Sequence, residues 1–269
     1  MTPTRILPSV IILLAAALPA HAGPPEIIAH RGSSFIAPEN TLASFNLAWK
    51  QDTDACELDT YLTTDHRVVV IHDATTKRTA GGKDLKVSES SSEELRKLDV
   101  GRFKGEQWAG EKIPFLEEVI ATIPPGKRLF TEIKCGPEIL PYLVPLIEKS
   151  GKKSQIIIIG FGLETMAAAK EKMPDVPVYW LRDTKRDPKD KKPQPHDLAW
   201  IKAVQDKKLD GIDVNYEGLT EAFAKAVHAA GLKLVTWTVD DVAEAKRDAV
   251  LGADGVTTNK PDVMKAALK

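Results

Sequence analysis

The chain has 269 residues, of which 43% are hydrophobic and 28% are charged, a composition that excludes disordered, collagen-like and coiled-coil proteins. Its 37 Lys and Arg residues nearly balance its 38 Asp and Glu residues, so the formal net charge is −1. Nucleic acid is not an expected partner, because there is no basic surplus to neutralise phosphates. The length suits one α/β barrel of roughly 250 residues or two smaller domains.

Residues 1–22 have the three parts of a secretory signal peptide. Arg5 lies in the first part, an apolar run follows, and Ala20 and Ala22 flank a histidine at the end. The apolar run is shorter than the ~20 residues that span a bilayer, so we expect no stable membrane insertion. We predict cleavage after Ala22 and export, to the periplasm or beyond, of a single barrel domain over 23–269.

Short β-branched or apolar runs alternate with segments of helical period from residue 26 onward,. The predicted strands are 26–30, 55–61, 68–72, 129–134, 156–160, 178–181, 211–214 and 234–238. The predicted helices between them are 41–49, 137–149, 163–172, 199–207, 220–230 and 242–251. This alternation predicts an α/β fold with a parallel sheet, and eight strands in ~250 residues predict a closed TIM-type (β/α)8 barrel.

Three segments depart from this rhythm. Residues 255–259 resemble a ninth strand, so either they close the barrel beside the first strand or a weaker run such as 211–214 is not a barrel strand. Residues 74–112 form a polar insertion after the third predicted strand, with one short helix candidate at 92–98. We expect this insertion over the catalytic face. Residues 182–195 are charged and rich in Pro, which is typical of a solvated loop,.

Acidic residues occupy matching positions on two predicted strands. Glu57 and Asp59 share one face of their strand because residues two apart point the same way, and the same holds for Glu132 and Lys134,. Inside a barrel, three carboxylates repel one another and lose solvation unless a cation compensates them. Each could pair with Lys or Arg, but the three together favour one hard divalent ion, Ca²⁺ or Mg²⁺.

Two histidines are expected on the face where barrel active sites lie. His30 and Arg31 follow the first predicted strand, and His72 ends the third. One histidine at a strand end is more often structural than catalytic, but two form a candidate acid/base pair. Such a pair suits a reaction in which one hydroxyl loses a proton and a leaving oxygen gains one. Arg31, Lys134 and a divalent ion would together hold a phosphodiester anion.

The order and spacing of these motifs resemble the glycerophosphodiester phosphodiesterase family, in an exported bacterial-type form. The resemblance covers essentially the whole mature chain. It rests on His-Arg at 30–31, Glu-x-Asp at 57–59, His-Asp at 72–73, Glu-Ile-Lys at 132–134, IPFLEEV at 113–119 and VTWTVDD at 235–241. It implies a metal-dependent hydrolase that converts small glycerophosphodiesters to glycerol 3-phosphate and an alcohol through a cyclic phosphate.

The resemblance also implies a role for individual residues. The implied acid/base pair is His30 and His72; the implied ligands of a divalent cation are Glu57, Asp59 and Glu132; the implied substrate contacts are Arg31, Lys134, Phe161 and Trp237. Two positions depart from the usual motifs of the family. Gly160 replaces a serine before Phe161, and Asp240 stands where asparagine is common.

Two other functions are compatible with parts of this pattern. A secreted lipid phosphodiesterase of the phospholipase D type shares the His and Glu-x-Asp motifs, but it would need an exposed apolar rim, and the insertion offers only Phe103 and Trp108. A non-catalytic exported binding protein would carry a broken catalytic set, and here the set is intact. Water-soluble deacylated esters are therefore the favoured substrates.

Cys56 and Cys135 are the only cysteines, and an oxidising compartment favours a disulfide between them,. Strand parity directs both side chains outward, toward the helices. The third predicted strand should separate them by roughly 9 to 10 Å, more than the ~7 Å between Cα atoms that a disulfide tolerates. We therefore predict two separate thiols.

Overall fold

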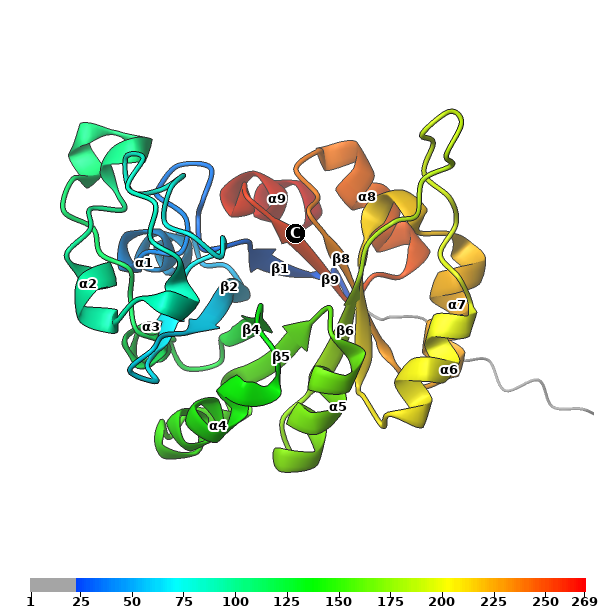
Figure 1. The fold of residues 1–269 in the computed structure, drawn as a ribbon. Helices are drawn as coiled ribbons and strands as arrows, with labels where there is room; N and C mark the ends of the chain where they lie inside the picture. Colours follow the sequence, from blue (N-terminus) through cyan, green and yellow to red (C-terminus); the bar gives the residue numbers. More distant parts are fainter. Residues whose placement is uncertain (1–22) are drawn as a thin grey trace, which may run out of the picture.

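The computed structural model describes residues 23–269, so the predicted signal peptide lies outside the described residues. Eight parallel strands form a closed barrel in the order β1-β2-β4-β5-β6-β7-β8-β9, and β9 is hydrogen-bonded to β1. Figure 1 shows the strands around the barrel axis with helices outside them. They are β1 (Glu26–Ala29), β2 (Ala55–Leu62), β4 (Arg128–Ile133), β5 (Ile156–Gly160), β6 (Val178–Arg182), β7 (Gly211–Asn215), β8 (Lys233–Trp237) and β9 (Gly255–Thr258). The predicted TIM-type barrel is confirmed.

Helices surround the barrel and bury their apolar faces against the strands,. The helices around the barrel are α1 (Leu42–Lys50), α3 (Leu116–Thr122), α4 (Leu140–Lys149), α5 (Leu163–Lys172), α6 (Ala199–Asp206), α7 (Glu221–Ala229), α8 (Val242–Leu251) and α9 (Pro261–Leu268). Side-chain caps begin several of them: the Thr41 hydroxyl accepts from Ser44 N before α1, and the Asp241 carboxylate accepts from Ala243 N before α8,. Single turns of 3₁₀ helix lie at Val87–Glu89, Arg102–Lys104, Glu106–Trp108, Pro137–Ile139, Lys153–Gln155 and Tyr216–Gly218.

The third predicted strand is not a barrel strand, and this corrects the sequence prediction. β3 (Val68–Val70) pairs antiparallel with β2, with Val70 opposite Thr60, and so lies outside the barrel. The ninth candidate, predicted over 255–259, forms β9 and closes the barrel beside β1, and the weak run that begins at Gly211 is a true barrel strand. A short apolar run has the same pattern in a hairpin and in a barrel strand, so periodicity cannot separate the two.

The insertion lies beside the barrel mouth. It contains the short helix α2 (Ser92–Arg96) and packs around its own apolar cluster with β3, on the left in Figure 1. Lys104 Nζ donates to Ser34 O at 2.7 Å, which ties the insertion to the β1–α1 loop. The chain between β6 and α6 is mostly exposed, as predicted, and projects as a hairpin at the upper right.

The two cysteines are free, as predicted, but for a different reason. β2 and β4 are neighbours, so no strand separates them. Cys56 lies opposite Leu129, whereas Cys135 lies beyond the end of β4. The two thiols are therefore offset along the sheet by roughly 20 Å, at ~3.3 Å per residue.

Among residues 23–269, no helix is both long enough and apolar enough to cross a bilayer.

Candidate active site

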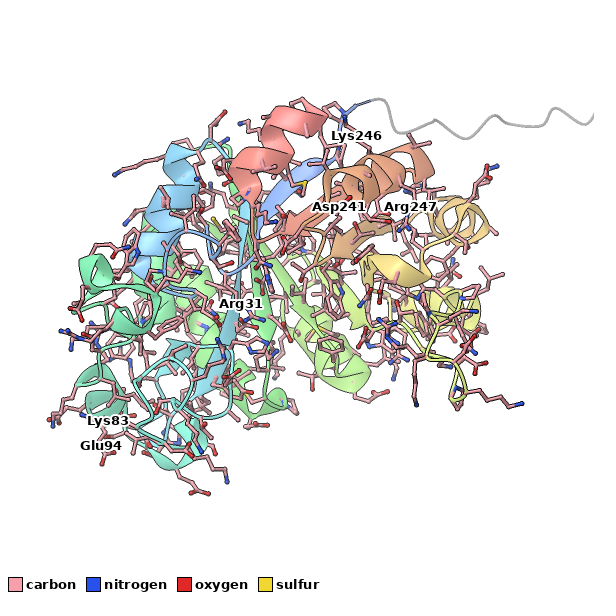
Figure 2. The ribbon with its side chains drawn as sticks, turned by 90° about the horizontal axis from the view of Figure 1, so that it is seen from above. Arg31, Lys83, Glu94, Asp241, Lys246 and Arg247 are labelled. Atoms are coloured by element: carbon pink, nitrogen blue, oxygen red, sulfur yellow. The ribbon has the colours of Figure 1, made fainter. Side chains whose placement is uncertain are left out.

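A cavity of about 140 Å³ opens at the carboxyl ends of the barrel strands, the end where barrel active sites lie. It brings together most of the residues singled out in the sequence. Its charged and aromatic lining residues and its histidines are His30, Arg31, Glu57, His72, Glu132, Lys134, Phe161, Asp213 and Trp237. Seen from above in Figure 2, Arg31 lies near the centre of the molecule, whereas Lys83 and Glu94 of the insertion lie at its edge. No insertion residue lines this cavity.

Glu57, Asp59 and Glu132 converge at one side of the cavity. Each offers a carboxylate oxygen, and these three oxygens lie within 4.8 Å of one another. Asp59 is paired in register with Glu132 across β2 and β4, which explains why two side chains distant in sequence meet. All three are buried. The cluster therefore has the oxygen ligands, spacing and burial that a hard divalent cation requires.

Two basic side chains adjoin this acidic cluster. Arg31 Nε lies 3.3 Å from Asp59 Oδ2, and Lys134 Nζ lies 3.2 Å from Glu132 Oε1. Although burial acts to raise the pKa of Asp59, Arg31 and Lys134 hold it below the ordinary value. The carboxylates thus meet two cations, so one negative charge remains uncompensated in the cluster.

The surplus negative charge and the burial raise the pKa values of Glu57 and Glu132. Burial, followed by repulsion from Asp59, raises the pKa of Glu57 well above its ordinary value, and the same causes raise that of Glu132 to about 8. Asp59 Oδ1 has no hydrogen-bond partner among the described residues. A bound divalent cation removes these penalties, so the residues present fit such an ion.

The β1–α1 loop folds tightly to place these groups. Arg31 adopts a left-handed backbone with φ 55°, and its N–H donates to Glu57 Oε2 at 3.0 Å. Gly32 follows with φ 77°, where a Cβ would lie 2.6 Å from the backbone of Ser44, so only glycine fits. Asn40, near the end of the loop, donates from Nδ2 to Asp59 Oδ2 at 2.8 Å. Asn40 was not singled out in the sequence.

His30 is held by a residue from the opposite end of the chain. Its Nδ1 lies 2.8 Å from Asn259 Oδ1, and Asn259 Nδ2 donates to Asp240 Oδ2 at 2.6 Å. Because the amide nitrogen faces a carboxylate, its oxygen faces His30 and accepts, so Nδ1 carries the hydrogen. His30 Nε2 then has a free lone pair. Burial, aided by Arg31, lowers the pKa of His30 to about 4.

His72 is held by a carboxylate instead of an amide. Its Nδ1 lies 2.7 Å from Asp73 Oδ1, so its Nε2 is also left for the pocket. The hydrogen bond from Arg78 lowers the pKa of Asp73 to about 2, which keeps this partner ionised. Arg78 comes from the insertion and also binds Glu39 at 2.6 Å. The Asp73 carboxylate thus orients the His72 ring, which lines the cavity.

An aromatic pair forms the other wall of the cavity. Phe161 and Trp237 pack edge to face with ring centroids 5.7 Å apart. Trp237 Nε1 donates to Asp213 O at 3.3 Å, which fixes the indole, and Phe161 stays 43% exposed at the mouth. This wall suits the carbon atoms of a substrate rather than its phosphate.

Comparison with known proteins decides the family. A model described as the glycerophosphoryl diester phosphodiesterase family matches residues 30–263. The match begins at His30 and takes in the acidic cluster, both histidines and the aromatic wall. The chain belongs to this family. It is therefore a phosphoric diester hydrolase of the glycerophosphodiester phosphodiesterase type.

Individual members of the glycerophosphodiester phosphodiesterase family match over most of the chain. A glycerophosphodiester phosphodiesterase of Caldanaerobacter subterraneus subsp. tengcongensis is 32% identical over 245 residues, covering 88% of this chain and 95% of the relative. One from Bacillus altitudinis is 29% identical over the same coverage of both chains. The solved structure of an Oleispira antarctica phosphodiesterase in complex with the product sn-glycerol-3-phosphate superimposes with a TM-score of 0.82. It is 28% identical and covers 91% of this chain and 96% of its own.

The two departures from the family motifs have local explanations. Asp240 accepts from Asn259 N at 2.8 Å as well as from its side chain, so it fixes the amide that holds His30. Gly160 ends β5, where a Cβ would lie 2.7 Å from Met166 Cε. Neither change alters the acidic cluster.

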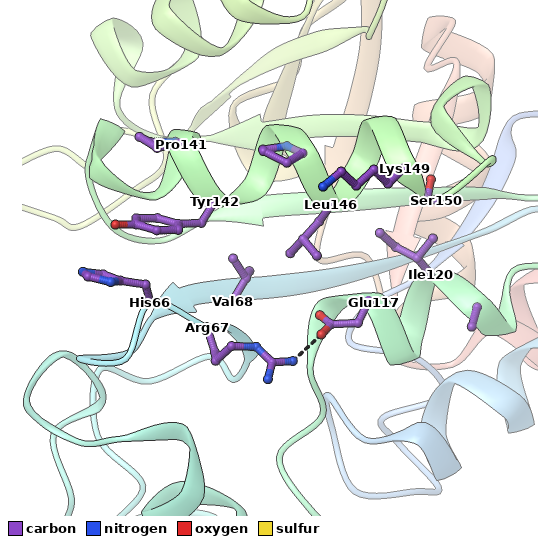
Figure 3. A pocket seen from close by; sticks show the side chains of 12 residues that line it. His66, Arg67, Val68, Glu117, Ile120, Pro141, Tyr142, Leu146, Lys149 and Ser150 are labelled. Carbon is purple, nitrogen blue, oxygen red and sulfur yellow. Dashed lines mark hydrogen bonds and ion pairs between the residues drawn. The ribbon is translucent and has the colours of Figure 1, made fainter.

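A larger cavity of about 470 Å³ lies outside the barrel, between α3 and α4 (Figure 3). Its lining is largely apolar, the His66 ring stacks on Tyr142, and Arg67 forms an ion pair with Glu117. None of the family's catalytic motifs reaches it. Size therefore does not mark the reactive site of this phosphodiesterase.

Proposed function

We propose that this enzyme hydrolyses glycerophosphodiesters to glycerol 3-phosphate and an alcohol in a reaction that depends on a divalent cation. The observation that carries the proposal is the meeting of His30 and His72 with the acidic cluster in one cavity of a family member. The product named in the Oleispira antarctica structure is sn-glycerol-3-phosphate, which supports the same chemistry.

Glu57, Asp59 and Glu132 would hold the cation, Ca²⁺ or Mg²⁺. When bound, it lowers the cost of ionising a hydroxyl and of placing charge on phosphoryl oxygens. Arg31 and Lys134 lie beside the carboxylates and would bind the non-bridging oxygens of the phosphodiester,.

The two histidines differ in their partners, which suggests distinct roles in the first step. His30 is bonded to a neutral amide, so its Nε2 is suited to take the proton of the glycerol 2-hydroxyl,. His72 is bonded to the Asp73 carboxylate, which orients its ring, so its Nε2 would give a proton to the leaving alcohol,. Attack of the 2-hydroxyl oxygen on phosphorus gives a cyclic phosphate and gains from the proximity of the two groups. Water then opens the ring with the roles exchanged.

The direct test is hydrolysis of glycerophosphocholine followed by phosphorus NMR, with Mg²⁺ or Ca²⁺ and after chelation. We expect glycerol 3-phosphate as product, a transient cyclic phosphate signal and loss of turnover with EDTA. An analogue whose 2-hydroxyl is methylated should not react. Its hydrolysis at the normal rate would exclude the cyclic route, and full activity after exhaustive chelation would exclude the cation.

A second candidate, hydrolysis of lysophospholipids at a lipid surface, gains support from the rim of the cavity. Phe35, Ile36 and Phe103 are 60%, 43% and 40% exposed. The first two lie in the β1–α1 loop, to which the Lys104 hydrogen bond ties the insertion. Lys260 Nζ lies 5.0 Å from the Phe35 ring, so cations accompany the apolar side chains, as in interfacial binding segments.

Cosedimentation with vesicles of equimolar phosphatidylcholine and phosphatidylglycerol separates the two candidates. A lipid-active enzyme should bind these vesicles and lose binding on the order of tenfold in Phe35→Ser. Turnover of soluble glycerophosphocholine should be unchanged in that variant, and Val250→Ser, at an exposed site on α8, serves as the matched control. If the wild-type protein does not bind the vesicles, the lipid-active candidate is excluded and only soluble substrates remain.

We also propose that the chain is exported, on the strength of the signal-like residues 1–22,.

A further inference from the structure

Asp213 is a buried acid in the active-site cavity that neither the metal cluster nor the histidine pair uses. It lies on β7, lines the cavity and is 2% exposed. Its Oδ1 has no hydrogen-bond partner among residues 23–269. A buried carboxyl without a partner costs free energy, so its place in the cavity calls for a ligand that supplies the missing hydrogen bond.

The residues in register with Asp213 on the two strands beside β7 are apolar. Its register neighbours are Leu181 on β6 and Val235 on β8, and both are buried. The carboxyl therefore faces the cavity between apolar walls. This arrangement resembles a binding site in which a single polar group selects for one hydroxyl or amine of the ligand.

The position of β7 in the barrel indicates which part of a substrate would reach the Asp213 carboxyl. In the closed strand order, β7 is four strands from β2 in either direction, so Asp213 lies across the barrel from Glu57 and Asp59. A phosphate held at the acidic cluster would extend its attached glycerol toward Asp213. The leaving alcohol would point to the mouth, where Phe161 is exposed.

We propose that Asp213 binds the terminal hydroxyl of the glycerol moiety and so selects glycerol esters over esters of simpler diols. This inference rests on the proposed function and adds to it the residue that sets the substrate class. A carboxylate accepts a hydrogen bond from that hydroxyl, and a carboxylic acid donates one, so the contact does not depend on the charge state. Leu181 and Val235 would contact the adjacent carbon atoms.

The test compares glycerophosphocholine with an analogue built on propane-1,2-diol, which keeps the attacking 2-hydroxyl and lacks only the terminal one. A site built around a hydroxyl rejects the ligand without it, so wild-type kcat/KM should favour glycerophosphocholine by on the order of 10²-fold or more. In Asp213→Ala, kcat/KM on glycerophosphocholine should fall by most of that factor, whereas kcat/KM on the analogue should hardly change. Asp213→Asn keeps the volume and a hydrogen bond, so its preference for glycerophosphocholine should lie between those of the wild type and Asp213→Ala.

The activity of Asp213→Ala on the analogue also reports that the variant is folded. Asp248→Asn removes another buried acid, on α8 outside the cavity, and should leave the substrate preference intact. An unchanged preference in Asp213→Ala, or an equal loss on both substrates, would overturn the inference. Wild-type enzyme that hydrolyses both substrates equally fast would overturn it while upholding the proposed function, whereas hydrolysis of neither would overturn both.

Discussion

His30 and Asn259, 229 positions apart in the chain, are joined by a hydrogen bond of 2.8 Å between Nδ1 and Oδ1. The bond exists because β9 closes the barrel beside β1, which places the end of β9 next to the end of β1. Ser34 Oγ donates to the same amide oxygen at 2.8 Å. Barrel closure thus sets the tautomer of an active-site histidine.

Loss of this contact should impair turnover more than substrate binding. In Asn259→Ala, His30 is free to rotate and to protonate Nε2, so kcat should fall about 10- to 100-fold while KM changes little. Steady-state kinetics on glycerophosphocholine measure the split. Asn215→Ala, which removes an amide bonded to Asp183, is the control and should retain its kcat.

Removal of either imidazole should have a larger effect. His30→Ala and His72→Ala should each lower kcat by on the order of 10² to 10⁴ without loss of the fold, the usual range for general acid/base groups. Circular dichroism and kinetics on the same preparations provide the check. Near wild-type turnover in a purified variant would remove that histidine from the mechanism.

Much of the molecule follows from pattern, and the exceptions have physical causes. Alternation of strands and helices predicts the barrel, and strand parity places Glu57, Asp59 and Glu132 on its inner face. β3 was assigned wrongly because three valines fit a hairpin as well as a barrel strand. The local sequence does not show which loops meet at the mouth of the barrel.

Three residues near the active site show that contacts between distant parts of the chain cannot be predicted from local sequence. Asn40 reaches Asp59 only through a loop with three residues of positive φ, and Asn259 reaches His30 only through closure of the barrel. The sequence predicts that Asp213 points into the barrel from a short strand. It does not predict that the residues in register with Asp213 on the two neighbouring strands are apolar. An acid in an otherwise apolar strand was the available signal.

The raised pKa values in the acidic cluster predict how pH acts on the metal-free protein. Glu132 has a pKa of about 8 in the fold against an ordinary value of 4.5. Between these values the folded state binds more protons than the unfolded state, so stability falls as pH rises through this window. Mg²⁺ or Ca²⁺ should abolish that fall. Melting temperatures from pH 5 to 9, with EDTA and with the cation, measure it.

The same linkage governs cation affinity. Binding must displace a proton from Glu132 below pH 8, so the apparent affinity should rise with pH and binding should release protons. Calorimetry in buffers of different ionisation enthalpy counts them. Glu132→Gln should weaken binding strongly while keeping the volume, and a pH-independent affinity in the wild type would contradict the raised pKa.

The signal-like segment, residues 1–22, predicts where the mature protein begins. Expressed with residues 1–22 in a secreting host, the protein should be cleaved after Ala22 and begin at Gly23,. Intact mass and N-terminal sequencing decide this. Ala22→Arg should block the cleavage, because the site requires a small residue.

Both thiols should persist even in an oxidising compartment. Cys56 is fully buried, and burial raises its pKa well above the ordinary value; burial raises that of Cys135 to about 11. Neither forms much thiolate at neutral pH, and the thiolate is the species that reacts. Titration with a thiol reagent should therefore be slow in the folded protein and give two thiols after denaturation without reductant. No thiols in the denatured sample would mean that the two cysteines are joined, which the offset along β2 and β4 forbids in this fold,.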